Sequence, residues 1–317
     1  MHLTESSNNP LVSMVLTTYN QGELAVAALE SLFDQTYRPI EIIVSDDCST
    51  DGTAEMLEKC VLQHKRDFKG GRVVFNKNTQ NLGIVRNSEK AFRLAEGALI
   101  ISCGGDDISY PQRAEIIVKK WNDSGRVATV IHHGFRPVSL SGEPTGEKWW
   151  KVSLAHPIGA AMAFSPIVVT EFPAVVETSG FEDNIFARRG YMLGDALFFD
   201  DVLVDYRRGA GVTSTGAMAS IRTRISRAMA ASARQNIIDL GNIRQRISEQ
   251  RFQEVLDMTS ALKHQYELEL GIYTSKTALG RMYALKEYRK IQPVGGGGEG
   301  ANKCVSTCNF PFVEASD

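Results

Sequence analysis

The sequence has few cysteines and no long apolar segment. Its 317 residues include 5 cysteines, too few for a disulfide framework in a chain of this length, so a reducing compartment suits it. No apolar run reaches the ~18 residues of a membrane-spanning helix. The polar start, MHLTESSNNP, lacks the basic and apolar regions of a signal peptide. These absences predict a cytoplasmic protein, and they leave docking at the inner face of a membrane open.

A strong charge of either sign is missing too. The 35 Lys and Arg against 37 Asp and Glu give a formal net charge of -2, so we expect no nucleic-acid partner. Two phosphate-binding motifs are also absent. No GxGxxG follows the first apolar run and no GxxxxGK[ST] occurs anywhere, which excludes a glycine-rich helix start as the phosphate site.

What is present is an alternation of short apolar runs and amphipathic segments from Leu11 to about Val138. The runs are LVSMVL, IEIIV, RVVF, ALIIS and VATVI. In the segment after the first run, Leu24, Ala28 and Leu32 recur every four residues, which is a helical period. Strands alternating with helices predict an α/β fold, a doubly wound and mostly parallel sheet flanked by helices.

The pattern changes in the second half, and we predict three regions. A first domain covers 1–215 and ends in turn-rich loops and acidic clusters. A helical extension covers 216–292, and a flexible tail with the glycine-rich GGGGEG covers 293–317. The basic start of the extension, IRTRISRAMAASAR, leaves three roles open: packing on the first domain, self-association, or contact with an anionic membrane. Its small, scattered apolar residues favour the first two.

Acidic residues follow two of the apolar runs. Asp46 and Asp47 follow IEIIV, and Asp106 and Asp107 follow ALIIS after two glycines. In a parallel sheet such strand ends share one edge, where ligands bind. A divalent cation with phosphate oxygens in its shell fits the second acidic pair, because hard cations take few carboxylates when a substrate phosphate supplies ligands.

Two segments together carry a family resemblance: VSMVLTTYNQGELAVAALESLFDQTYRPIEIIVSDDCSTDGT and, later, NLGIVRNSEKAFRLAEGALIISCGGDD. Their order and spacing resemble family-2 glycosyltransferases with the GT-A fold, closely over 11–111 and more weakly to about 214. The resemblance implies an inverting enzyme that moves a sugar from a nucleotide-diphosphate donor, a UDP-sugar, to an acceptor hydroxyl during synthesis of a surface or extracellular polysaccharide. It implies Mn or Mg as cofactor and a carbohydrate or lipid-linked acceptor.

The resemblance also implies a nucleotide site. Thr17, Tyr19 and Asp47 match positions that hold the base and ribose, and Arg86 lies in a segment that borders them.

The metal site is implied in the same way. Asp106 matches the last acid of the family's DxD motif, which holds the metal on the diphosphate, whereas Gly104 replaces the first acid. Asp107 is then a candidate for the second metal contact.

Sugar transfer also needs a general base for the acceptor hydroxyl. The family places it in an ED or xD pair at a helix start, and GDALFF matches, with Gly194 before Asp195. We therefore expect Asp195 to be the base, with a helix N-cap as its structural alternative. Asp200 and Asp201 are weaker candidates.

Glu182 and Asp183 are also weaker candidates for the base and are interpreted as part of a loop over the acceptor. Arg207 and Arg208 either reach the diphosphate or are solvated.

Two aromatic residues and a histidine complete the candidates. Trp149 and Trp150 either stack on the acceptor or pack in the interior, and His156 is a candidate for a donor-sugar contact.

Two other functions stay open. One is a nucleotide-binding module without turnover, which Gly104 favours. The other is a nucleotidyltransferase, which needs a glycine-rich, basic phosphate loop after the first strand; TTYNQGE is not such a loop.

Overall fold

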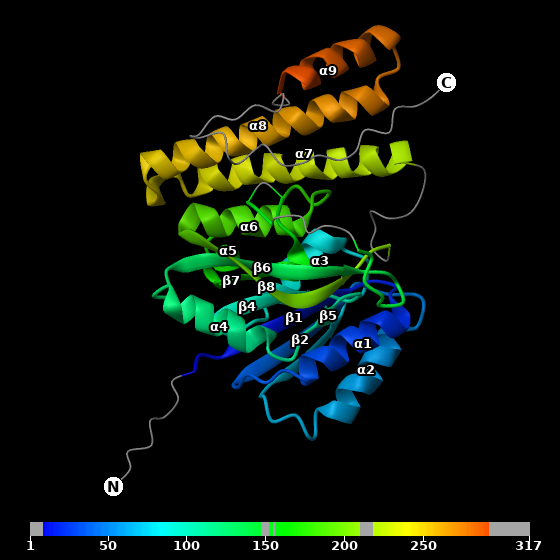
Figure 1. Cartoon of the computed structure of the whole chain (residues 1–317), viewed down its shortest axis with the longest axis vertical. Coiled ribbons are helices and arrows are strands. Elements are labelled where there is room, and N and C mark those ends of the chain that lie inside the picture. The colour runs from blue at the N-terminus through cyan, green and yellow to red at the C-terminus, as the bar shows by residue number, and fades with distance from the viewer. Residues whose placement is uncertain (1–8, 147–151, 155, 210–217, 292–317) are drawn as a thin grey trace.

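A mixed eight-stranded sheet forms the centre of the protein (Figure 1). The computed structural model describes residues 9–146, 152–154, 156–209 and 218–291. The strands are β1 (Val12–Thr18), β2 (Ile40–Asp46), β3 (Val73–Lys77), β4 (Leu99–Gly104), β5 (Ile108–Ser109), β6 (Ala128–Val138), β7 (Met162–Phe164) and β8 (Asp195–Arg207). The helices are α1 (Gly22–Phe33), α2 (Thr53–His64), α3 (Ile84–Phe92), α4 (Arg113–Asp123), α5 (Ile167–Thr170), α6 (Glu182–Leu193), α7 (Met218–Asn242), α8 (Glu249–Thr274) and α9 (Ala278–Ile291), with short 3-10 turns η1 (Gly159–Ala161) and η2 (Arg244–Arg246).

The strand order is β3-β2-β1-β4-β7-β6-β8-β5. β1 pairs in parallel with β2 and β4, β2 with β3, and β6 with β8, whereas β7 runs antiparallel between β4 and β6. The predicted α/β fold with a doubly wound, mostly parallel sheet is confirmed. Because β7 reverses direction between β4 and β6, those two strands end at the same edge.

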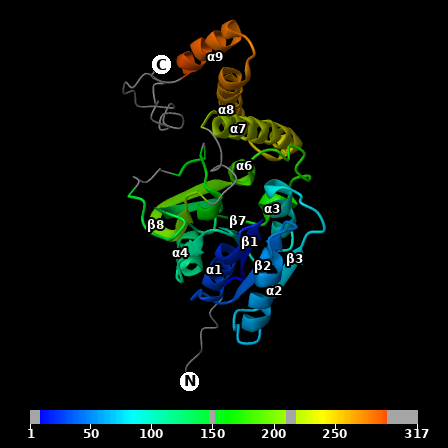
Figure 2. The same cartoon turned by 90° about the vertical axis from the view of Figure 1, so that its right-hand side faces the viewer.

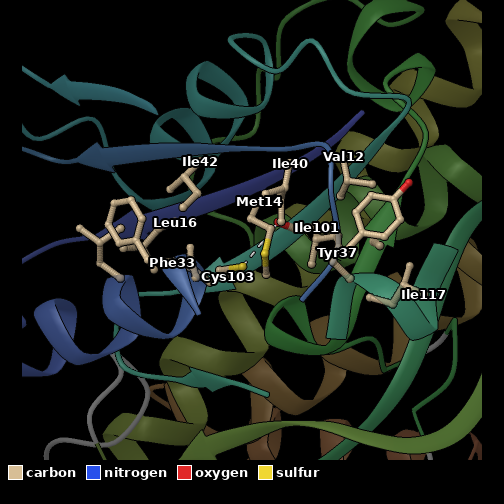
Figure 3. Packing of buried hydrophobic residues seen from close by; sticks show 14 of the residues in the cluster. Val12, Met14, Leu16, Phe33, Tyr37, Ile40, Ile42, Ile101, Cys103 and Ile117 are labelled. Atoms are coloured by element: carbon tan, nitrogen blue, oxygen red, sulfur yellow. Dashed lines mark hydrogen bonds between the residues drawn. The ribbon is translucent and has the colours of Figure 1, made fainter. Parts of the chain in front are cut away.

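Both faces of the sheet are covered, which explains why its central strands are apolar throughout. Met14 and Leu16 point to one face and pack against α1, α2 and α4 in a cluster shown in Figure 3. Val15 points to the other face and packs with residues of α3, α5 and α6. The two cores position the strand ends rigidly.

The helical extension packs on the outer side of α6. α7, α8 and α9 follow one another away from the sheet (Figures 1 and 2), so packing, the first of the three roles, is observed. Arg189 of α6 makes a two-pronged ion pair with Asp239 of α7, at 2.7 and 2.9 Å, and both side chains are fully buried. The predicted boundary at 215/216 and the tail 293–317 lie outside the described residues. None of the described helices is both long and apolar enough to span a bilayer.

Candidate active site

The ends of three neighbouring strands meet at one edge of the sheet, as the sequence predicts. Thr17 lies opposite Gly104 in the pairing of β1 with β4, and Thr18 lies opposite Asp46 in the pairing of β1 with β2. The N–H of Gly105 donates to the carbonyl of Thr17 at 3.0 Å. The loop after β4 is therefore held beside the end of β1.

Asp106 and Asp107 turn their carboxylates back over Gly104. A Cβ atom at Gly104 would lie 2.8 Å from Oδ2 of Asp107 and 3.0 Å from Oδ1 of Asp106, so one oxygen of each faces the same small space. Asp107 is only 6% exposed. Burial, and then the carboxylate of Asp106, raise the pKa of Asp107 well above its ordinary value, and burial also raises the pKa of Asp106. Two ionised carboxylates this close repel each other, and a shared proton or a bound cation relieves that repulsion.

This pair of oxygens fits a divalent cation. Mn and Mg accept a few carboxylate ligands from a protein when phosphate oxygens and water complete the shell. Glycine at 104 leaves the space between the two carboxylates open. Among the described residues no group of three or more His, Cys, Asp or Glu side chains is placed to hold a metal.

Arg207, the last residue of β8, lies against the acidic pair. Its backbone N–H donates to Oδ1 of Asp107 and its Nη1 donates to the carbonyl oxygen of Asp106, both at 2.8 Å. The Nε of Arg207 is buried and has no hydrogen-bond partner in the part of the chain that the structure describes. A buried guanidinium N–H beside a cation site suits a phosphate oxygen. The neighbouring Arg208 is exposed.

Asp47 is buried, and its carboxylate holds a loop. It accepts hydrogen bonds from Nδ2 of Asn78 at 2.9 Å, from the N–H of Leu82 at 2.9 Å and from the N–H of Gly83 at 2.8 Å. Gly83 has a φ of 79°, which a side chain would strain. Asp47 therefore shapes the loop that leads into α3, and its contact with a nucleotide stays a prediction.

The other predicted nucleotide residues are accessible. Thr17 is half-buried, Tyr19 is exposed after β1, and Arg86 is exposed on the first turn of α3. Their contacts with base and ribose also stay predictions.

A second acidic pair, Glu182 and Asp183, begins α6 rather than lying in a loop. Oδ2 of Asp183 accepts from the N–H of Gly159 in η1 at 3.2 Å. η1 is tied to the end of β4 by a buried arginine: Nη2 of Arg113 donates to the carbonyls of Ser102 and Ala160, at 2.9 and 2.8 Å. This second pair therefore lies at the same edge of the sheet as the first.

The surroundings of Tyr206, the neighbour of Arg207, also indicate that the two acidic pairs lie near each other. Burial raises the pKa of its hydroxyl, and the carboxylates of Asp107, Asp106 and Asp183 raise this pKa further. Carboxylates from both acidic pairs thus lie around one phenol group. The sequence contains a signal for the second pair, because the acidic residues of FED are the first two residues of a helix, the position at which the family resemblance expects the base.

The two members of the second pair differ in the groups that stabilise their ionised forms. Burial, and then Asp183, raise the pKa of Glu182 to about 8. Burial raises the pKa of Asp183 too, while hydrogen bonds from Asn184 and Gly159 and the charge of Arg188 oppose the shift. Burial therefore favours the protonated form of Glu182, whereas the hydrogen bonds and the Arg188 charge favour the ionised form of Asp183, so Asp183 is the better proton acceptor of the two.

Asp195 begins a strand, so the prediction that GDALFF begins a helix is wrong. It is the first residue of β8 and pairs with Ala128 at the start of β6, at the edge of the sheet opposite Gly104. β8 runs for 13 residues to Arg207, on the order of 40 Å at about 3.3 Å per residue. The Asp195 side chain is 67% exposed and lies 3.3 Å from Nη2 of Arg251.

The physical reason is local sequence. The residues after Asp195 include Phe198 and Phe199 and then two valines, types that favour a strand. The weaker candidates Asp200 and Asp201 lie along the same strand and are exposed.

The helical extension reaches the second acidic pair. The hydroxyl of Tyr266 in α8 lies 3.1 Å from Nε2 of His156 in a hydrogen bond, and burial, then Arg188, lower the pKa of His156 to about 4. Both Tyr266 and Asp183 lie close enough to Arg188 to oppose the fall of its pKa to about 10 on burial. His156 therefore contacts α8, and its contact with a donor sugar stays a prediction. Trp149 and Trp150 lie outside the described residues.

Known proteins resemble this chain in sequence. The family described as Glycosyl transferase family 2 matches residues 13–166. The chain is 34% identical to the UDP-Glc:alpha-D-GlcNAc-diphosphoundecaprenol beta-1,3-glucosyltransferase WfaP of Escherichia coli over 97 residues, which cover 31% of this chain and 36% of that protein. The chain thus spans little more than a third of the length of this relative.

Two solved structures resemble it in fold. S. aureus TarS 1-349 in complex with UDP-GlcNAc has a TM-score of 0.62 at 16% identity, over 88% of this chain and 81% of that one. The mannosyltransferase PcManGT from Pyrobaculum calidifontis, in complex with GDP-Man and Mn2+, has a TM-score of 0.56 at 19% identity, over 90% and 83%. This likeness establishes the GT-A fold.

Proposed function

The chain carries a glycosyltransferase family 2 domain over residues 13–166, and we propose that it transfers a sugar from a nucleotide-diphosphate donor to an acceptor hydroxyl. One observation carries the proposal. The acidic pair Asp106–Asp107, the buried Nε of Arg207 and the carboxylate of Asp183 converge on one edge of the sheet. These are the groups that a diphosphate leaving group and an acceptor hydroxyl require.

The donor end of the site is the edge around Gly104. Asp106 and Asp107 hold Mn or Mg, which supplies charge neutralisation for the diphosphate when it is bound. Arg207 donates from Nε to a phosphate oxygen. Thr17 and Tyr19 contact the base and ribose, and we propose uridine as the base because TarS, a structural relative, was solved with UDP-GlcNAc.

The acceptor end is the start of α6. Asp183 removes the proton of the acceptor hydroxyl, and the acceptor oxygen forms a bond to the anomeric carbon. The bond from that carbon to the diphosphate oxygen breaks, and its electron pair leaves with the nucleoside diphosphate. A single displacement of this kind inverts the anomeric configuration.

The name of a relative supports the proposed acceptor and its setting. WfaP is named for a sugar on diphosphoundecaprenol as its acceptor. We extend this chemistry to a lipid-linked carbohydrate acceptor for this chain, used in the synthesis of a surface or extracellular polysaccharide.

Release of nucleoside diphosphate from sugar donors tests the proposal. The full chain is incubated with UDP-glucose, UDP-N-acetylglucosamine or GDP-mannose and Mn, with and without lipid-linked saccharides. We expect acceptor-stimulated release from a UDP-sugar by the wild-type chain and by Asp195→Asn, and none by Asp106→Asn. Binding of UDP with Mn but no release from any donor, with any acceptor, would favour the nucleotide-binding module instead.

A further inference from the structure

The last described helix, α9, carries large apolar side chains on the surface. Leu279, Met282 and Tyr283 are 79%, 66% and 65% exposed. Their spacing of three and four residues places them on one face of the helix, and Lys286 and Lys290 continue that face by the same spacing. The face is therefore apolar at its beginning and basic at its end.

The opposite face of α9 attaches it to the protein. Ala284 is the buried residue of the helix, and a Cβ atom placed on Gly271 of α8 would lie 3.3 Å from its Cβ. The two helices thus approach closely on this side. α9 is the outermost layer of the molecule, at the end farthest from α1 and α2 (Figures 1 and 2), so the apolar face points away from the sheet.

Positive charge is concentrated in the same outermost segment of the chain. Residues 276–291 contain five basic residues, Lys276, Arg281, Lys286, Arg289 and Lys290, and one acidic residue, Glu287. This is an excess of four positive charges. Because the formal net charge of the whole chain is -2, the rest of the chain carries -6.

From this arrangement we propose that α9 docks the protein on an anionic lipid surface, lying in the plane of the interface. Leucine, methionine and tyrosine enter the boundary between head groups and acyl chains, as in amphipathic helices that lie on membranes. Lysine and arginine keep their charged ends in the head-group layer and are attracted to anionic lipids. The proposal does not rest on the sugar-transfer activity.

The chemistry favours a membrane over a second copy of this chain. A stable interface between copies buries on the order of 800 Å² per partner, whereas the exposed apolar face of α9 consists of three side chains on four helical turns. A lipid surface needs no complementary shape, and each basic residue near it strengthens binding by electrostatic attraction that salt screens.

Sedimentation with lipid vesicles tests the proposal on the full chain. The vesicles consist of phosphatidylcholine alone or with about one third phosphatidylglycerol. We expect the wild-type chain to sediment with the anionic vesicles, and high salt to weaken this binding. Lys286→Glu with Arg289→Glu should reduce binding at least tenfold, and Leu279→Ser with Tyr283→Ser several-fold.

The chain offers matched controls at its other end. Lys65 and Arg66 are exposed near the end of α2, and Leu62 of that helix is 65% exposed. Lys65→Glu with Arg66→Glu makes the same charge change, and Leu62→Ser removes an exposed leucine. Both should bind anionic vesicles as the wild type does. All these positions are exposed, so equal melting temperatures confirm folding.

Three outcomes would overturn the proposal. One is a wild-type chain that does not sediment with anionic vesicles. Another is an equal loss of binding in the α2 variants, which would mean that net charge alone is responsible. A third is a dimer in light scattering that the α9 variants dissociate, without vesicle binding, which would make a second copy the partner.

Discussion

The two edges of the sheet hold acidic residues in opposite ways. At the edge where β1, β2 and β4 end, Asp107 and Asp183 are partly or fully enclosed and are in contact with backbone N–H groups. At the other edge, Asp195 is 67% exposed and its charged neighbour is Arg251 at 3.3 Å. A single strand, β8, connects the two edges.

This difference separates the carboxylates suited to catalysis from those that form surface ion pairs. Enclosed carboxylates have pKa values set by burial and neighbours, and such perturbed groups are typical of functional sites. An exposed carboxylate beside an arginine has the properties of an ordinary surface ion pair. The topology of the sheet decides which acidic residues are enclosed at the ligand-binding edge and which are exposed at the other edge.

The largest expected effect concerns Asp183, the proposed general base. Asp183→Asn removes the carboxylate from the start of α6 but keeps its shape, and general bases contribute about 10²–10⁴-fold in rate. We expect kcat to fall by that factor. Asp195→Asn is the matched control at the opposite edge and should leave kcat within about twofold. Equal losses in the two variants would remove the distinction between the edges.

Two ion pairs join the helical extension to the first domain, and they differ in burial in the same way as the acidic residues at the two edges. Arg189–Asp239 is fully buried, whereas Arg251–Asp195 is largely exposed. Breaking a buried pair costs about 3–5 kcal/mol, and a surface pair contributes about 0–1 kcal/mol. We expect Asp239→Ala to lower the free energy of unfolding by about 3–5 kcal/mol. Asp195→Ala should lower it by less than about 1 kcal/mol. Urea titration measures both. A small loss in Asp239→Ala would contradict the burial of this pair.

The pH dependence of stability reports on Glu182. Its pKa of about 8 in the folded protein lies above the ordinary value of about 4.3 in an unfolded chain. Between these values the unfolded chain releases the proton and the folded protein retains it. The contribution of Glu182 to stability is therefore complete below pH about 4.3 and is lost as the pH rises to about 8, by at most about 1.4 kcal/mol per pH unit.

Glutamine cannot ionise, so Glu182→Gln should flatten this decline. Urea midpoints measured from pH 5 to pH 8 check it, with Glu254→Gln as a control because that glutamate is exposed in α8. Parallel curves for the wild type and Glu182→Gln would show that Glu182 titrates normally.

The smallest effect concerns the contact between the extension and the acceptor end. Tyr266→Phe removes the hydroxyl that bonds Nε2 of His156, a loss of about 1 kcal/mol for a typical hydrogen bond. We expect a fall of a few degrees or less in melting temperature and a few-fold fall in kcat, while UDP binding is unchanged. An equal fall in UDP binding would mean that the extension supports the donor end as well.

The sequence predicts the first half of the fold well because its signals are local. β1, β2 and β4 are buried on both faces, and the helical period between Leu24 and Leu32 lies within α1. The positions of Asp106 and Asp107 at the ligand-binding edge follow from the end of a single strand.

The second half depends on contacts that local patterns do not contain. β8 has irregular pairing with β6, with three register shifts, and this irregularity obscures the alternation that identifies a strand. The placement of Asp183 beside the end of β4 depends on β7 turning back between β4 and β6. The outward face of α9 becomes recognisable only when the side that packs on α8 is known.

The most direct test of the account is the melting temperature of the chain with nucleoside diphosphates. UDP, GDP, dTDP and CDP are each added with and without Mn to the wild type, Asp106→Asn and Asp195→Asn. A ligand that binds the folded state raises the melting temperature, by an amount equivalent to about 2.7 kcal/mol at 100 times its Kd. The account requires a rise with UDP that depends on Mn, persists in Asp195→Asn and disappears in Asp106→Asn. A rise that survives in Asp106→Asn, or no rise with any of the four in the wild type, would contradict it.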